Sequence, residues 1–141
     1  MTRNIKIRFE RGGEFIATLI EDKAPKTCEA IWRALPLEGD VLHSKWSGKG
    51  MFIGTHLGDR LPRENQSSIM SSGYVGYWRE WFNEEKGDEV IEVYYGPGVV
   101  RDDRGVTQLN IFALIENFKE LADVGTRIWM QGKEKMTIHR I

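Results

Sequence analysis

Apolar residues recur at every second position from Ile5 to Phe9 and again from Phe15 to Leu19, on the two sides of the pair Gly12-Gly13. The apolar members of this alternation are Ile5, Ile7 and Phe9, then Phe15, Ala17 and Leu19. A period of two is that of a half-buried strand, and a glycine pair suits a tight turn. Residues 4–20 are therefore predicted to form a β-hairpin. Its second strand also carries Ile16 and Ile20, which is typical of a strand covered on both faces.

Two segments have helical spacing instead. In residues 25–36 the apolar stripe is Cys28, Ile31, Trp32 and Leu35, and Pro25 suits a first helical turn. In residues 110–123 the stripe is Ile111, Leu114, Ile115, Phe118, Leu121 and Ala122. Asn110 is a suitable N-cap for this second helix, and Gly125 is a typical residue just after a helix. We expect helices near 25–36 and 110–123.

The other apolar runs predict strands. They lie within 41–56 on both sides of "WSGKG", in the aromatic segment 73–82, and at 89–96, 127–130 and 135–141. Two long polar connections, 57–72 and 97–108, separate them. Seven or eight strands with two helices that do not alternate with them favour a closed, mainly antiparallel β-barrel, because closure removes the sheet edges. We expect one domain over residues 1–141, with the helices capping the barrel.

Composition excludes several classes of protein. The 141 residues contain 20 Lys and Arg against 21 Asp and Glu, which argues against a dedicated nucleic-acid-binding protein. No run approaches the roughly 20 apolar residues of a membrane helix. The single cysteine, Cys28, allows no intrachain disulfide, and we expect it to be a core residue. A lone thiol favours a reducing compartment, so we expect a cytoplasmic protein. We also expect no cofactor.

Several short motifs resemble those of cyclophilins. They are "EDKAPKTCEAI" after the hairpin, "LHSKWSG", and the C-terminal segments "NIFALIENFKELADVG" and "KEKMTIHRI". The chain is more similar to the bacterial cyclophilin-like proteins of unknown function, on Ala24–Thr27, Trp46–Gly48, Gly76–Trp78 and Tyr95–Gly96. This resemblance also implies a closed barrel.

The resemblance implies a change at the cyclophilin active site. Active cyclophilins have an arginine directly after a Phe-His pair, and this arginine hydrogen-bonds the prolyl nitrogen. Here Leu42 and His43 are followed by Ser44, while Lys45 falls on the opposite face of a strand. We therefore expect very low prolyl isomerase activity.

We predict a ligand pocket on the flank of the barrel. Its candidate residues are Ser44, Trp46, Arg60, Arg63, Tyr74, Tyr77 and Trp78. Aromatic side chains would exclude water, and an arginine from the 59–66 loop would bind an anion through a bidentate fork, so the expected ligand is a small acidic molecule or a peptide. The loop "RDDRG" at 101–105 offers Asp102 and Asp103 as weaker acid or base candidates. No residue is assigned as catalytic, and the spacing of His43, His56 and His139 does not predict a metal site.

Three other functions stay open at this point. The chain could be a divergent prolyl isomerase in which Arg60 or Arg63 replaces the missing arginine. It could be an enzyme acting on a small acidic metabolite, or a structural oligomer subunit without a ligand. The apolar faces of residues 14–20 and 74–82 predict a homodimer or a higher homo-oligomer.

Overall fold

A computed structural model describes residues 2–141 as twelve strands and two helices. The strands of the first half are β1 (Asn4–Phe9), β2 (Glu14–Leu19), β3 (Leu37–His43), β4 (Gly48–Thr55), β5 (Gln66–Ser67) and β6 (Ile69–Met70). Those of the second half are β7 (Tyr74–Arg79), β8 (Glu89–Val99), β9 (Arg101–Asp102), β10 (Gly105–Val106), β11 (Leu109–Ile115) and β12 (Glu134–Arg140). The helices are α1 (Pro25–Ala34) and α2 (Leu121–Gln131).

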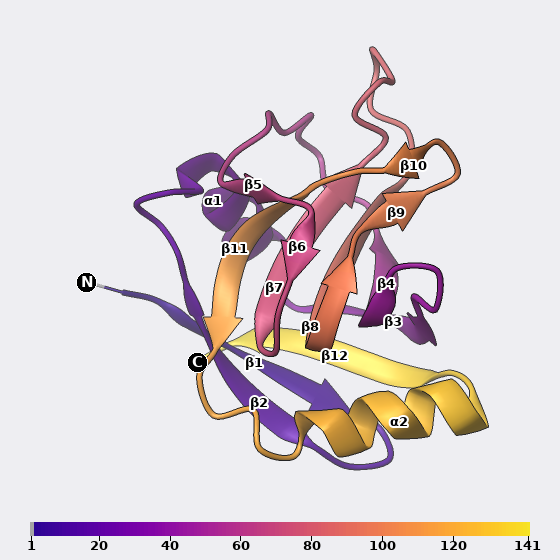
Figure 1. Cartoon of the computed structure of the whole chain (residues 1–141). Coiled ribbons are helices and arrows are strands. Elements are labelled where there is room, and N and C mark those ends of the chain that lie inside the picture. Colours follow the sequence, from indigo (N-terminus) through magenta and orange to yellow (C-terminus); the bar gives the residue numbers. More distant parts are fainter. Residues whose placement is uncertain (1) are drawn as a thin grey trace.

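Eight of the strands form a closed antiparallel barrel, as the sequence predicted (Figure 1). Their order is β2-β1-β12-β3-β4-β8-β7-β11, and β11 pairs again with β2. Three residue pairs close this seam: Leu19 with Ala113, Thr18 with Leu114, and Ala17 with Ile115. The short strands β5 and β6 extend β11 and β8, and β9 with β10 forms a separate small hairpin.

The alternation along β8 separates the inside of the barrel from its outer face. Ile91, Val93 and Tyr95 belong to the main core, where they pack with residues of the other barrel strands. Val90, Glu92 and Tyr94 therefore point outward, because successive side chains of a strand point to opposite faces. A second apolar cluster covers part of this outer face, and it consists of Met70, Tyr94, Val100, Leu109 and Ile111. The flank of the barrel therefore has a small hydrophobic core outside the barrel, separate from the main core.

The first helix lies where its apolar spacing predicted. Cys28 and Ile31 of α1 are fully buried, and the Glu64 carboxylate accepts hydrogen bonds from the backbone N–H groups of Lys26 and Thr27 at the start of the helix. Burial raises the pKa of the Cys28 thiol to about 12, and its Sγ donates to the carbonyl oxygen of Phe112 at 3.3 Å. Cys28 is therefore a packing residue.

The second helix lies later in the chain than predicted. Residues 109–115 form strand β11, and α2 covers 121–131, so the expected strand at 127–130 is helical. Strand β11 shows no clear alternation because it is covered on both faces: Phe112 joins the main core, while Leu109 and Ile111 join the outer cluster. Gly125 does not end a helix but lies inside α2, where a Cβ atom would be 2.1 Å from the Tyr95 ring. Its missing side chain lets α2 pack directly on β8.

No helix within residues 2–141 is long and apolar enough to cross a membrane.

Candidate functional site

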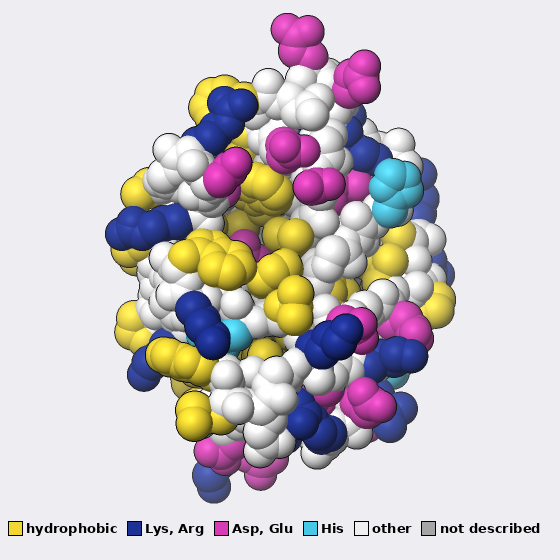
Figure 2. All heavy atoms as spheres, turned by 90° about the vertical axis from the view of Figure 1, so that its right-hand side faces the viewer, with side chains coloured by type: hydrophobic (Ala, Val, Ile, Leu, Met, Phe, Trp, Pro, Cys, Tyr) yellow, Lys and Arg dark blue, Asp and Glu magenta, His cyan; other side chains and the backbone are white. Residues whose placement is uncertain are grey.

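A cavity of about 570 Å³ opens on the outer flank of the barrel, over strands β4, β8 and β7. Its walls are apolar and mostly aromatic: Trp46, Phe52, Trp78 and Val90. Figure 2 shows the cavity as a hollow that hydrophobic side chains surround, with an acidic side chain at its bottom. A concave apolar site with a few polar groups is the usual form of a small-molecule site, so we name it the main cavity.

Glu92 supplies the carboxyl group of this cavity. It is 7% exposed, and its Oε1 accepts hydrogen bonds from the hydroxyls of Tyr94 at 3.0 Å and Ser44 at 3.3 Å. Its Oε2 accepts no hydrogen bond from residues 2–141. This oxygen is not completely covered by protein, because the completely covered side-chain atoms without a partner in residues 2–141 are His43 Nδ1 and Thr55 Oγ1. Burial raises the pKa of Glu92 to about 7, and the bonds from Tyr94 and Ser44 oppose this shift. The carboxyl can therefore gain or lose a proton near neutral pH.

Close backbone packing holds the partners of Glu92 in place. The Tyr94 ring fits against Gly50 and Gly98, where added Cβ atoms would lie 2.6 and 2.8 Å from ring atoms. Ser44 begins the turn between β3 and β4, and its backbone N–H donates to the carbonyl oxygen of Gly50 at 2.9 Å. Only glycine leaves room for the tyrosine here, so the β3–β4 turn, β4 and β8 together fix the carboxyl.

The rim of the main cavity is mostly acidic. The β9–β10 hairpin contributes Arg101, Asp102 and Asp103, and the segment before β8 contributes Asp88. Three rim carboxylates thus face one guanidinium. Trp78 is anchored at this rim, since its indole Nε1–H donates to the Thr107 hydroxyl at 3.2 Å. This charge favours a ligand that carries hydrogen-bond donors or positive charge.

Three of the seven predicted ligand-binding residues lie at the main cavity. Trp46 and Trp78 form its walls, and Ser44 holds Glu92. Tyr77 points instead into the barrel core, where its hydroxyl donates to Glu89 Oε2 at 2.5 Å. Tyr74 lines a different hollow, of about 310 Å³, beside Ile20 and Leu114.

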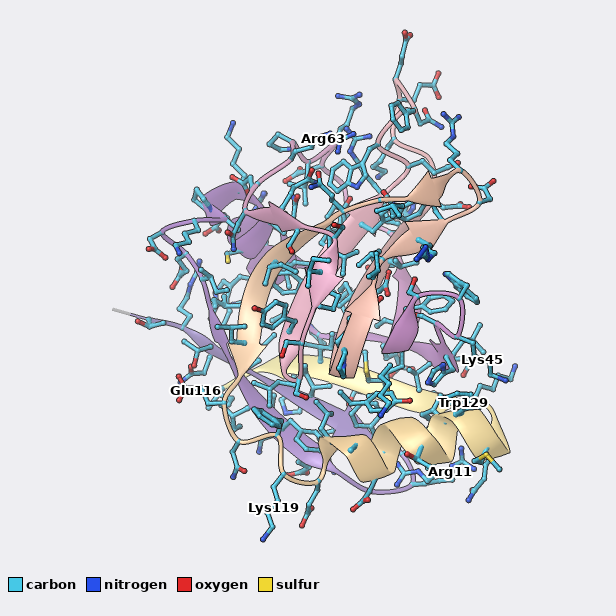
Figure 3. All side chains as sticks on the ribbon, viewed as in Figure 1. Arg11, Lys45, Arg63, Glu116, Lys119 and Trp129 are labelled. Atoms are coloured by element: carbon cyan, nitrogen blue, oxygen red, sulfur yellow. The ribbon has the colours of Figure 1, made fainter. Side chains whose placement is uncertain are left out.

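The two predicted arginines do not line the main cavity. Arg60 Nη2 donates to the carbonyl oxygen of Asn83 at 3.2 Å. Arg63 Nη1 donates to Gln66 Oε1 at 2.9 Å, and its guanidinium lies 5.2 Å from the centre of the Trp81 ring. Figure 3 shows Arg63 at the top of the molecule, at the far end from Trp129. The expectation of an acidic ligand rested on these two side chains, and Arg101 is the arginine found at the cavity.

Glu92 is the residue that sequence reasoning missed. The run "EVIEVYYG" was interpreted only as a strand, although it places two carboxylates, Glu89 and Glu92, among β-branched and aromatic residues. An acidic residue inside such a run is the signal that could have identified it, because a buried carboxyl without a cationic partner is costly. Residues 2–141 bring together no three His, Cys, Asp or Glu side chains suited to a metal ion.

Two solved structures share the fold. McbB, determined in complex with tryptophan, superposes with a TM-score of 0.74 at 16% sequence identity. The match covers 96% of this chain but 44% of McbB, so the chain spans less than half of that protein. The hypothetical protein AF2241 from Archaeoglobus fulgidus, known from a solution structure, has a TM-score of 0.67 and 24% identity, with 99% and 95% of the two chains covered.

Sequence comparison adds a family to this fold. No curated protein is recognisably similar to the chain. A family model described as "Protein of unknown function (DUF3830)" matches residues 8–139, almost the whole barrel. The chain therefore belongs to the DUF3830 family.

Proposed function

We propose that this protein binds a small molecule in the main cavity, with a flat apolar body between the tryptophans and a nitrogen donor against Glu92. The single observation that carries the proposal is the free Oε2 of a buried carboxyl at a cavity with aromatic walls. A buried carboxyl with unused acceptor capacity is unfavourable in an isolated protein, and a ligand N–H or ammonium removes that cost.

The walls and the rim support the same ligand class. Trp46 is 57% exposed, and its ring meets Phe52 edge to face with the centroids 5.8 Å apart. Aromatic faces attract cations and stack on flat rings. Because Asp88, Asp102 and Asp103 outnumber Arg101 at the rim, an amine is attracted and a simple anion is repelled. We therefore infer an aromatic amine or a related heteroaromatic base, in place of the acidic molecule that the sequence suggested.

McbB offers indirect support for this choice. The solved structure of that protein contains tryptophan, which has an aromatic body and an amino group. At 16% identity the likeness establishes a common fold, and we extend the ligand class to this chain only as part of the proposal.

Proton exchange at Glu92 provides a direct test. The groups that face this carboxyl are the hydroxyls of Ser44 and Tyr94 and, from the rim, Asp88, Arg101, Asp102 and Asp103. An ammonium ion beside Glu92 stabilises the carboxylate and lowers its pKa. Because this pKa is about 7 in the free protein, binding of an amine at pH 7 releases roughly half a proton.

The experiment is isothermal titration calorimetry with tryptamine at pH 7, in phosphate and in Tris, whose ionisation enthalpies differ. We expect binding with proton release, and much weaker binding of indole-3-acetate, which has the same ring with a carboxylate. Glu92→Gln should weaken tryptamine binding by about tenfold and abolish the buffer dependence. Glu116→Gln is the matched control, because Glu116 is exposed on the β11–α2 connection, away from Trp129 and Lys45 in Figure 3.

Two results would contradict the proposal. One is equal binding of tryptamine by the wild-type protein and Glu92→Gln, with Glu116→Gln unchanged. The other is a preference for indole-3-acetate, which would restore the expectation of an acidic ligand.

We also infer that the barrel is a divergent relative of the cyclophilins that lacks ordinary prolyl isomerase activity. The support is the set of N- and C-terminal motifs, together with Ser44 and Glu92 at the place where an isomerase would need a guanidinium. A protease-coupled proline-peptide assay tests this, and turnover close to that of an active cyclophilin would refute it.

A homodimer and a cytoplasmic location stay predictions. The dimer is consistent with Ile16 on β2 and Leu114 on β11, which are 45% and 37% exposed on the two strands that close the barrel. Light scattering that gives about the monomer mass of 16.3 kDa would contradict it.

A further inference from the structure

A second hollow, of about 360 Å³, lies beside the main cavity and shares two of its wall residues, Trp46 and Phe52. Its other side is formed by the end of α2, with Ile128 and Trp129. Lys45, in the β3–β4 turn, places its Nζ 6.0 Å from the centre of the Trp129 ring. Figure 3 shows these two labelled side chains next to each other at the end of α2. A molecule that crosses the Trp46–Phe52 pair therefore reaches from one hollow into the other.

The two hollows have opposite charge. The main cavity has Glu92 and three rim aspartates against one arginine, whereas the second hollow is lined by Lys45, Lys133 and the neutral His43, with no acidic residue. Lys45 forms no ion pair within residues 2–141, and the pair of Lys133 with Asp40 is exposed and 3.5 Å long. At least one ammonium group at this hollow is thus free to bind an anion.

His43 adds an unused polar group to the second hollow. Its side chain is nine-tenths buried, and the Tyr95 hydroxyl lies 2.6 Å from its Nε2. In the tautomer in which this hydroxyl donates to Nε2, the ring hydrogen lies on Nδ1. Nδ1 is buried and has no hydrogen-bond partner. The ring of the half-exposed Trp129 packs beside His43 with the two ring centroids 4.9 Å apart, and both side chains line the second hollow.

The end of α2 would oppose an anion if its carbonyl groups were unpaired, because a helix C-terminus carries partial negative charge. Arg11 reduces this effect. Its guanidinium donates to the carbonyl oxygen of Gly132 at 2.9 Å and to Gln131 Oε1 at 3.0 Å. The basic character of the second hollow therefore persists next to the helix end.

We propose that the ligand is dipolar: its nitrogen end meets Glu92 in the main cavity, and a carboxylate lies in the second hollow against Lys45, Lys133 and His43. This inference rests on the proposed function and adds a second binding group to it. Short peptides with an aromatic first residue have this arrangement, since a free amino terminus and a free carboxylate stand on either side of a flat side chain.

The test compares tryptophylglycine with tryptophylglycinamide by calorimetry at pH 7. The two peptides differ only in the terminal carboxylate, which the amide lacks. We expect the acid to bind about fivefold more tightly than the amide, which is the range of two partly exposed ion pairs. In the variant Lys45→Ala/Lys133→Ala the preference for the acid should fall below about twofold, because only His43 remains, while the dissociation constant of the amide stays within about twofold of the wild-type value. The matched control is Lys26→Ala/Lys119→Ala, which removes two exposed lysines elsewhere.

The outcomes separate this inference from the proposed function. Equal binding of acid and amide by the wild-type protein, with tryptamine binding still dependent on Glu92, overturns only the dipolar ligand. A preference for the acid that is undiminished in Lys45→Ala/Lys133→Ala does the same. Absence of binding of tryptamine and of both peptides overturns the main-cavity proposal and this one together.

Discussion

Two buried glutamates, Glu92 on β8 and Glu134 on β12, occupy surroundings that shift their pKa values in opposite directions. Both are less than a tenth exposed. Glu92 has only hydroxyl partners, and burial raises its pKa to about 7. Burial also raises the pKa of Glu134, but the hydrogen bonds from Arg127 and Arg11 outweigh it, so the net shift is downward.

The two carboxylates differ in how many of their oxygen atoms have hydrogen-bond partners. Glu134 Oε1 accepts from Arg127 Nε at 2.8 Å and from Arg11 Nε at 3.0 Å, and Oε2 accepts from the backbone N–H of Arg11 at 2.7 Å. It joins the β1–β2 turn, α2 and β12 into one corner. Glu92 has one oxygen without a partner. A buried carboxyl satisfied by cations is structural, whereas one left half satisfied at a cavity is available to a ligand.

The largest expected effect is on the free energy of unfolding, which should distinguish the structural role of Glu134 from the ligand-binding role of Glu92. Glu134→Gln should lower the free energy of unfolding by about 3–4 kcal/mol, because it leaves two arginines without their shared carboxylate. Glu92→Gln should change it by less than about 1 kcal/mol at pH 6, where the carboxyl is largely protonated. Urea denaturation of both variants measures this, and a larger loss for Glu92→Gln would reverse the assignment of roles.

The second prediction uses pH. The pKa of Glu92 is raised from 4.5 to about 7 on folding, so between these values the folded state binds more protons and stability falls as pH rises. From pH 5 to pH 8, Glu92→Gln should gain about 2–3 kcal/mol relative to the wild type. Glu134 acts outside this window. Because its pKa is lowered on folding, the stability that it contributes is lost only as the pH falls below about 4.5. Burial and the charge of Lys45 lower the pKa of His43. Because His43 is present in both proteins, its contribution cancels from the difference in their unfolding free energies.

The comparison at pH 5 and pH 8 needs denaturation curves for only these two proteins. A constant difference between them across that range would show that Glu92 titrates near its ordinary value.

A third prediction concerns the cradle of Tyr94. Gly50→Ala places a Cβ 2.6 Å from the Tyr94 ring and should cost about 2 kcal/mol, besides weakening tryptamine binding by displacing the hydroxyl from Glu92. Gly54→Ala lies on the same strand, with nothing within 4 Å of the added atom, and should change stability by less than about 0.5 kcal/mol. Equal melting temperatures for the two variants would contradict this close packing.

The smallest effect is expected for Ser44→Ala. The hydroxyl bond to Glu92 is 3.3 Å long and favours the carboxylate, so its loss should raise the pKa of Glu92 further and cost about 0.5 kcal/mol. Carbon-13 NMR titration of the Glu92 carboxyl measures the shift. A pKa that falls in this variant would mean that Ser44 is bonded to the protonated form.

Sequence patterns predicted most of the barrel because half-buried strands keep their alternation. The hairpin of β1 and β2, the strands around "WSGKG" and the last strand all have one inward and one outward face. The pattern misplaced the second helix because β11 is covered on both faces and lost its period of two. Gly125 strengthened that error, since a glycine required for packing against Tyr95 looks like a helix terminator in the sequence.

Sequence could predict only those residues of the candidate site that lie within one short segment of the chain. Ser44 and Trp46 lie in one turn and Trp78 in one aromatic segment, so short motifs identified them. Glu92 becomes a cavity residue only when β4 and β7 pair on either side of β8. That Arg101 and not Arg60 or Arg63 lies at the cavity was equally beyond the sequence, because both loops contain arginines and only tertiary packing brings one loop to the cavity.

The seam between β2 and β11 has a consequence for the order of folding. Its three residue pairs join segments near residues 18 and 114, and like the pairs between β1 and β12 they connect distant parts of the chain. Contacts of this kind form late because a long loop must be ordered first. Until they form, β2 and β11 are open edges that another chain can pair with. The seam is therefore one place where a slowly refolding population would exchange strands or aggregate.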